Sequence, residues 1–151
     1  PSIDEKIPIG KGRIISEGKK IAILNFGARL QECITAKENL LKKGINPTLV
    51  DARFAKPLDE NLIWQIATDH EYLITIEEGS IGGFGSHVLK FLSEKNFLDS
   101  NLKIRTINFP DKFIDQDNPV EMYKHAGLDA NSIEQKVLDL LNSKIVLQKQ
   151  K

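Results

Sequence analysis

The sequence lacks most features that mark secreted, membrane-spanning or metal-binding proteins. It holds one cysteine, Cys33, which excludes an internal disulfide and a thiolate metal cluster. No apolar run approaches the length that a membrane-spanning helix needs. Cysteine and histidine pairs at metal-ligand spacing are also missing, so we expect no protein-bound zinc. A protein of a reducing cytoplasm, without a membrane partner, fits these absences best.

An excess of charge of one sign is lacking too. The 21 basic and 21 acidic residues give a formal net charge of zero, so no long-range field attracts nucleic acid or an anionic membrane. A length of 151 residues suits one domain with a sizeable core. We therefore expect a single domain that binds no nucleic acid.

The ends of the sequence differ from its middle. The chain starts at Pro1, and its opening PSIDEKIPIGKG has the build of neither a signal peptide nor a transit peptide. We interpret the chain as an excised piece or a processed product. We expect an extended linker arm over residues 1–11, a domain over 12–147 and a frayed tail over 148–151.

Patterns typical of strands and helices alternate along the domain. RIIS is expected to be a short edge strand that leads by a tight turn into the mostly apolar KIAILNFG, and LKIRTINFP to lie near the sheet margin. Such alternation predicts a three-layer α/β/α sandwich with a mainly parallel sheet. Strands are expected at 13–16, 20–27, 47–52, 71–78 and 102–110, and helices at 29–43, 59–69 with Asp59 as cap, 84–95, 118–127 and from 129 onward.

The stretch TIEEGSIGGFGSHV, residues 75–88, allows two interpretations. Glu77 or Glu78 could act as an acid or base while the amides around Gly82, Gly83, Gly85 and Ser86 hold an anion. The glycines follow the third strand–helix unit and do not fit a dinucleotide fingerprint. The structural interpretation, which we favour, gives the glycines positive φ and close strand–helix contact, with Gly83 at a special backbone position. The glutamates would then be hydrogen-bonded inside or face a partner chain.

Three further features carry less chemistry. Arg53 and Lys56 flank Phe54 in a loop that could clamp a phosphate, although a salt bridge to a neighbouring domain explains the aromatic residue better. Cys33 lies on the apolar face of a predicted helix, where an inert core thiol belongs. The acidic run DKFIDQD matches no calcium-loop spacing and is expected to be a helix-capping loop.

Several long, ordered motifs carry a resemblance to a known family. The runs PIGKGRIISEGKKIAILNFG, VDARFAKPLDENLI, HEYLITIEEGSIGGFGSHVLKFL and FPDKFIDQDNPVEMYKHAGLDANSI closely resemble the C-terminal domain of the 1-deoxy-D-xylulose-5-phosphate synthases, a branch of the transketolase family. The likeness covers nearly the whole chain. It implies a five-stranded sheet with one antiparallel edge strand, which RIIS could supply.

The resemblance also implies a function for the intact enzyme. Such enzymes depend on thiamine diphosphate and magnesium, and they condense pyruvate with glyceraldehyde 3-phosphate, with release of carbon dioxide, to feed isoprenoid, thiamine and pyridoxal synthesis. The groups that bind cofactor, metal and sugar phosphate belong to the two preceding domains of that family. We therefore assign no catalytic, cofactor-binding or metal-binding residue to this chain and expect it to be inactive alone.

The role left to this chain is structural. Its expected partners are the upstream domains of the same enzyme and a second subunit of a homodimer. Two alternatives stay open: an independent regulatory module that binds a phosphorylated metabolite at the glycine-rich bend, and the C-terminal part of another transketolase-family subunit. The interface candidates are Arg53, Phe54, Lys56, Glu77, Glu78 and Phe84.

Overall fold

A computed structural model describes residues 7–79, 82–108 and 119–142 of the chain. Its sheet has five strands in the order β1-β3-β2-β4-β5, and only the β1–β3 pair is antiparallel. The predicted fold class is thereby confirmed. The strands are β1 (Arg13–Ser16), β2 (Ile21–Phe26), β3 (Thr48–Asp51), β4 (Tyr72–Glu77) and β5 (Lys103–Ile107).

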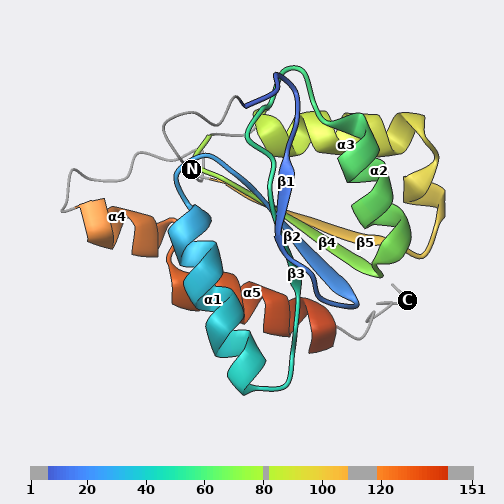
Figure 1. The fold of residues 1–151 in the computed structure, drawn as a ribbon. Helices are drawn as coiled ribbons and strands as arrows, with labels where there is room; N and C mark the ends of the chain where they lie inside the picture. Colours follow the sequence, from blue (N-terminus) through green and yellow to red (C-terminus); the bar gives the residue numbers. More distant parts are fainter. Residues whose placement is uncertain (1–6, 80–81, 109–118, 143–151) are drawn as a thin grey trace, which may run out of the picture.

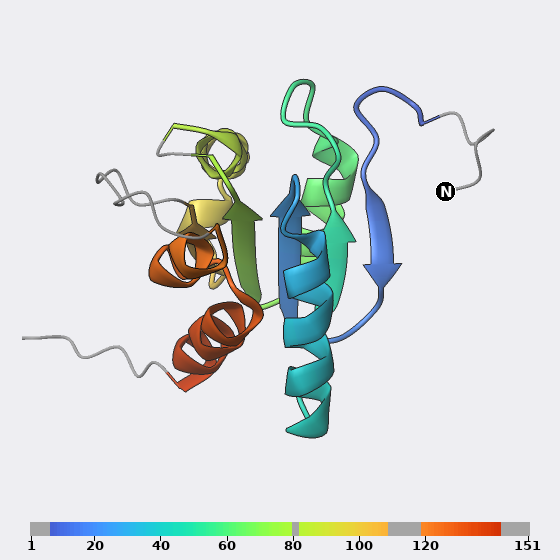
Figure 2. The same ribbon diagram turned by 90° about the vertical axis from the view of Figure 1, so that its left-hand side faces the viewer.

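The helices cover both faces of the sheet, as Figures 1 and 2 show. One face carries α1 (Leu30–Lys42), α4 (Pro119–His125) and α5 (Ala130–Asn142). The other carries α2 (Glu60–Asp69), α3 (Phe84–Glu94) and the short 3-10 helix η1 (Phe97–Asp99). None of the helices within the described ranges is long and apolar enough to cross a membrane.

Two apolar layers fill the space between the sheet and its helices. Alternate residues of β2 and β4 point to opposite faces, so that Ile23 and Ile74 join the α1–α5 layer while Leu24 and Leu73 join the α2–α3 layer. All four side chains are fully buried. Burial on both faces explains why the two central strands read as continuous apolar runs.

The first strand pairs differently from what its tight turn suggests. β1 does not form a hairpin with β2 but lies antiparallel to β3, with an irregular register between Ile14 and Ser16. The connection instead crosses the start of β3, where the Gly18 amide donates to Thr48 Oγ1 at 2.9 Å. A side chain at Gly18 would overlap the backbone of Asn46 and Pro47, so glycine is required at this crossing.

The remaining predicted elements agree with the structure to within a few residues. Asp59 caps α2 as predicted, because its Oδ1 accepts the amide of Leu62 at 3.2 Å. β5 lies at the sheet margin, with Arg105 and Thr106 exposed. The short helix η1 was not predicted. The acidic run 111–117 and the tail 148–151 lie outside the described residues.

Candidate functional site

The carboxyl ends of four parallel strands meet at one edge of the sheet, which is where ligand sites form in this class of fold. Residues 27–29, 52–59 and 78–79 all leave the sheet there, and residues 82–83 lead from this edge into α3. They contain most of the residues that the sequence singles out for chemistry. The question is whether their polar groups are free to bind something else or are bound to one another.

Glu77, at the end of β4, is bound to the chain's own helix α3. Its Oε1 accepts the amide of Phe84 at 3.0 Å, and its Oε2 accepts the amide of Gly85. Gly83, the residue that precedes α3, supplies no side-chain cap, so Glu77 satisfies the amides of the first turn from a distance. The side chain is only 4% exposed. Glu77 is therefore a structural carboxylate in this chain.

The glycines of the bend have separate tasks. Gly82 takes the positive φ, at +96°, and its amide donates to Ser86 Oγ at 3.1 Å. Gly83 has a φ of −80°, so the special backbone position expected there belongs to its neighbour. Gly85 provides close contact, because an added Cβ would lie 2.9 Å from Thr75 Oγ1 and 3.2 Å from Glu77 Oε2. These contacts fix the β4–α3 joint.

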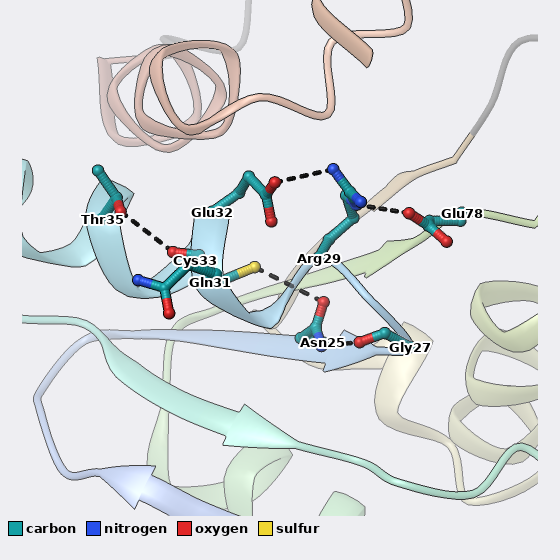
Figure 3. Close-up of polar contacts among 8 residues, drawn as sticks. All are labelled: Asn25, Gly27, Arg29, Gln31, Glu32, Cys33, Thr35 and Glu78. Carbon is teal, nitrogen blue, oxygen red and sulfur yellow. Dashed lines mark hydrogen bonds and ion pairs between the residues drawn. The ribbon is translucent and has the colours of Figure 1, made fainter. Parts of the chain in front are cut away.

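Glu78 points to the opposite face from Glu77 and takes part in a second cluster, shown in Figure 3. Arg29 Nη1 lies 2.8 Å from Glu32 Oε1, and Arg29 Nε lies 2.6 Å from Glu78 Oε1. The second contact is an ion pair without hydrogen-bond geometry. The guanidinium also stacks over the ring of Tyr123 in α4, 3.7 Å from its centroid. Arg29 therefore connects the β2–α1 loop to the residue that follows β4 and to α4.

The sequence patterns did not pair Arg29 with Glu78 or Tyr123. The period of two along a strand could have indicated that Glu77 and Glu78 have different surroundings, because it sends adjacent side chains to opposite faces of the sheet. No comparable pattern in the sequence indicates the contact between Arg29 and Tyr123, because Tyr123 lies 94 positions after Arg29. Such a contact depends on tertiary packing alone.

Cys33 is a core thiol, as its position on the apolar helix face predicted. It is fully buried, and its Sγ lies 3.7 Å from Asn25 Oδ1 (Figure 3). Burial, with a smaller contribution from the nearby Glu32 carboxylate, raises the pKa of the Cys33 thiol to about 12. The thiolate that a nucleophile requires is therefore strongly disfavoured.

The loop after β3 is partly bound to its own strand. Asp51 accepts both the Arg13 Nε and the Arg53 amide at 3.2 Å, and Arg53 has a φ of +59°. Phe54 is half-buried and Lys56 is exposed.

Of the six interface candidates, Phe84 lies in the core at 1% exposure and stacks on Phe26. Phe84 and Glu77 therefore offer a partner almost no surface.

The described residues do not fit a thiamine diphosphate or magnesium site. Within residues 7–79, 82–108 and 119–142, no three histidine, cysteine, aspartate or glutamate side chains gather as metal ligands would. Both oxygens of Glu77 accept amides, and Glu78 pairs with Arg29. A diphosphate or a divalent cation would have to displace these contacts.

The strand order and the helices on both faces define a five-stranded α/β/α sandwich domain. At the carboxyl edge of its sheet, the polar groups described above bind one another. A family model described as "Transketolase, C-terminal domain" matches residues 10–133. This chain therefore belongs to the transketolase C-terminal domain family.

Two solved structures of longer chains are similar to this chain. One, described as a split gene transketolase, inactive beta4 tetramer, is 29% identical with a TM-score of 0.82, over 91% of this chain and 44% of that chain. The other, a transketolase from Campylobacter jejuni subsp. jejuni NCTC 11168, is 13% identical with a TM-score of 0.62, over 86% of this chain and 18% of that chain. The second likeness concerns the fold alone. This chain spans less than half the length of either protein.

Proposed function

We propose that this chain is the C-terminal domain of a 1-deoxy-D-xylulose-5-phosphate synthase. The intact enzyme would be a cytoplasmic homodimer that uses thiamine diphosphate and magnesium to condense pyruvate with glyceraldehyde 3-phosphate. The family membership supports a transketolase-type enzyme. The choice of this branch rests on the long motifs of the sequence, among them VDARFAKPLDENLI and HEYLITIEEGSIGGFGSHVLKFL.

Within that enzyme, the domain would hold other domains and the second subunit in place without taking part in the chemistry. The observation that supports this role is that both carboxylate oxygens of Glu77 accept amides at the start of α3. A general acid or base needs an oxygen within reach of the substrate, and Glu77 is almost fully buried. The residues we propose for the interface are Arg53, Phe54, Lys56 and Glu78. Lys56 is exposed, and the other three are partly buried.

A second candidate is the C-terminal part of another transketolase-family enzyme whose catalytic half is a separate chain. The similar structure described as a split gene transketolase favours this possibility. The phosphometabolite-binding module has weaker support, because the Phe84 and Gly85 amides are already bound to Glu77. Its thermal stability would have to rise with saturating inorganic phosphate, in contrast to that of a pure interface domain.

The test is a carbon dioxide release assay with pyruvate, glyceraldehyde 3-phosphate, thiamine diphosphate and magnesium. The assay compares three samples: the intact enzyme, this chain alone, and a mixture of this chain with the separately produced upstream part. We expect activity in the intact enzyme and none in this chain. Activity of the intact enzyme with a ketose phosphate donor, and none with pyruvate, would replace the synthase by another transketolase-type enzyme. Activity of this chain alone would refute the structural role.

A further inference from the structure

The carboxylate of Asp59 binds the segment before β1 to the domain. Asp59 caps α2 through the Leu62 amide, and the same side chain accepts the Gly12 amide at 3.1 Å through Oδ2. Lys11 Nζ adds an ion pair with Oδ1 at 3.4 Å. Asp59 thus ties the first turn of α2 to a segment 47 positions earlier in the chain.

The same segment forms a turn that packs closely on the domain. An extended arm is predicted over residues 1–11, but the chain turns at Pro8–Lys11, where the Lys11 amide donates to the Pro8 carbonyl at 3.2 Å. Gly10 is buried with a φ of +70°, and an added Cβ would lie 2.8 Å from Pro57 Cγ. At Gly12 an added Cβ would lie 2.6 Å from Leu62 Cδ2. The backbone of the turn therefore packs directly on the domain.

Two isoleucines point outward at this turn, next to the exposed side chain of Lys11. Ile9 is 80% exposed and Ile7 is 47% exposed, although they flank a proline in a segment that is held in place. A scattered exposed isoleucine is ordinary, but here one lies directly before the attached turn and a second lies within it. Ordering the turn before binding reduces the entropy cost of docking it against a partner.

We infer that Asp59 locks the Pro8–Gly12 turn onto α2, and that Ile7 and Ile9 thereby form an apolar docking surface for the preceding domain of the same polypeptide. This inference rests on the proposed function. The partner follows from the family, which is a C-terminal domain, and from length, since 44% of the similar split gene transketolase chain is covered. A domain attached through this turn is held at a high effective concentration beside the two isoleucines.

Limited trypsin digestion of the full-length protein tests the lock. Asp59→Ser keeps a good helix cap for the Leu62 amide, but the shorter side chain cannot reach Gly12 or Lys11. We expect cleavage after Lys11 to become about tenfold faster than in the parent protein, because the turn opens locally. Asp129→Ser is the matched control, because Asp129 caps α5 through the Ser132 amide at 3.0 Å, on the opposite face of the sheet from α2. Equal cleavage rates in the Asp59→Ser and parent proteins would overturn the lock.

Thiol labelling of the full-length protein tests the docking surface. The Ile9→Cys variant is compared with Leu41→Cys, whose position is 45% exposed, and the parent protein gives the background. Cys33 adds little to that background, because it is buried with a raised thiol pKa. We expect Ile9→Cys to react about tenfold more slowly than Leu41→Cys, and this protection to fall when Asp59→Ser is added.

Two outcomes would overturn the docking surface. Equal labelling of the two variants would mean that the isoleucines face water. Protection that disappears on dilution would assign the surface to a second copy of the chain. Neither experiment uses substrate, so its result is independent of the carbon dioxide assay. An enzyme without pyruvate activity can still show both protections, and an active synthase can lack them.

Discussion

Glu77 and Asp59 both bind the first turn of a helix, but they use their oxygens differently. Glu77 gives both oxygens to α3 and is 4% exposed. Asp59 divides its oxygens between α2 and the Pro8–Gly12 turn and is 9% exposed. The first carboxylate closes a joint inside the domain, whereas the second also attaches a segment that presents apolar side chains to the outside.

The comparison teaches that the most enzyme-like stretch of this sequence is its most internally bound part. Glu77 accepts two amides at the start of α3 inside the β4–α3 joint, and Glu78 pairs with Arg29. The surfaces that we propose for partners lie instead at Glu78, at the loop after β3 and on the N-terminal turn. Four predictions test this contrast, in order of decreasing effect on stability.

Removing the Glu77 carboxylate should have the largest effect. Glu77→Ala leaves the amides of Phe84 and Gly85 buried without acceptors, and we expect a loss of roughly 2–4 kcal/mol in unfolding free energy. Urea denaturation of this chain measures the loss. Glu78→Ala is the control, since Glu78 accepts none of the α3 amides and Arg29 keeps Glu32 and Tyr123 as partners, so the loss should be clearly smaller than for Glu77→Ala. Equal losses for the two variants would remove the distinction between a closed joint and a surface cluster.

Removing the Asp59 carboxylate should have a smaller effect. Asp59→Ala loses one helix cap and the hydrogen bond to Gly12, and we expect a cost of about 1–2 kcal/mol in unfolding free energy. Asp59→Ser should recover most of this loss, because serine is a comparably good cap. The midpoints of thermal unfolding of both variants measure the difference. If the serine variant is as unstable as the alanine variant, the turn rather than the cap carries the stability.

A third carboxylate makes stability depend on pH. Glu134 in α5 pairs with Lys43 after α1 at 2.6 Å, and hydrogen bonding to Lys43 lowers the pKa of Glu134 from its usual 4.5. A lowered folded-state pKa means that the pair stabilises the fold above about pH 4.5 and loses this contribution as pH falls through the folded-state pKa. Glu134→Gln should therefore lower the unfolding midpoint at pH 7 but not at pH 3, which thermal melts at both pH values can measure. A constant difference would contradict the coupling.

The smallest effect on stability is expected at Phe54. Its half-buried ring belongs to neither apolar layer, so Phe54→Ser should leave the unfolding midpoint of this chain nearly unchanged. In the intact enzyme, the same variant should weaken association of domains or subunits, because aromatic residues often dominate such interfaces. Analytical ultracentrifugation over a dilution series detects the change. Leu98→Ser, at a 50%-exposed position on η1, is the control, and an equal effect of both variants would remove Phe54 from the interface.

Much of the fold followed from local patterns. The apolar runs at Ile21 and Tyr72 and the helical spacing around Leu40 and Ile66 predicted strands and helices within a few residues of their observed ends. Such patterns are visible because burial imposes a period of two or 3.6 on the chain itself. The pairing of β1 with β3 was not visible, because a tight turn is compatible with more than one neighbour in a sheet.

The sequence by itself determined the α/β alternation, the helix cap at Asp59, the burial of Cys33 and the resemblance to transketolase-type enzymes, because each depends on residues close together or on long ordered motifs. Tertiary structure alone decided the partners of the polar groups. The role of Glu77 as a cap of α3 depended on the fold, which places the amides of Phe84 and Gly85 within reach of its carboxylate. Arg29 met Tyr123, and Asp59 met Gly12, only because packing brings distant segments together. Side-chain type sets what a group can bind, but the fold sets what lies within its reach.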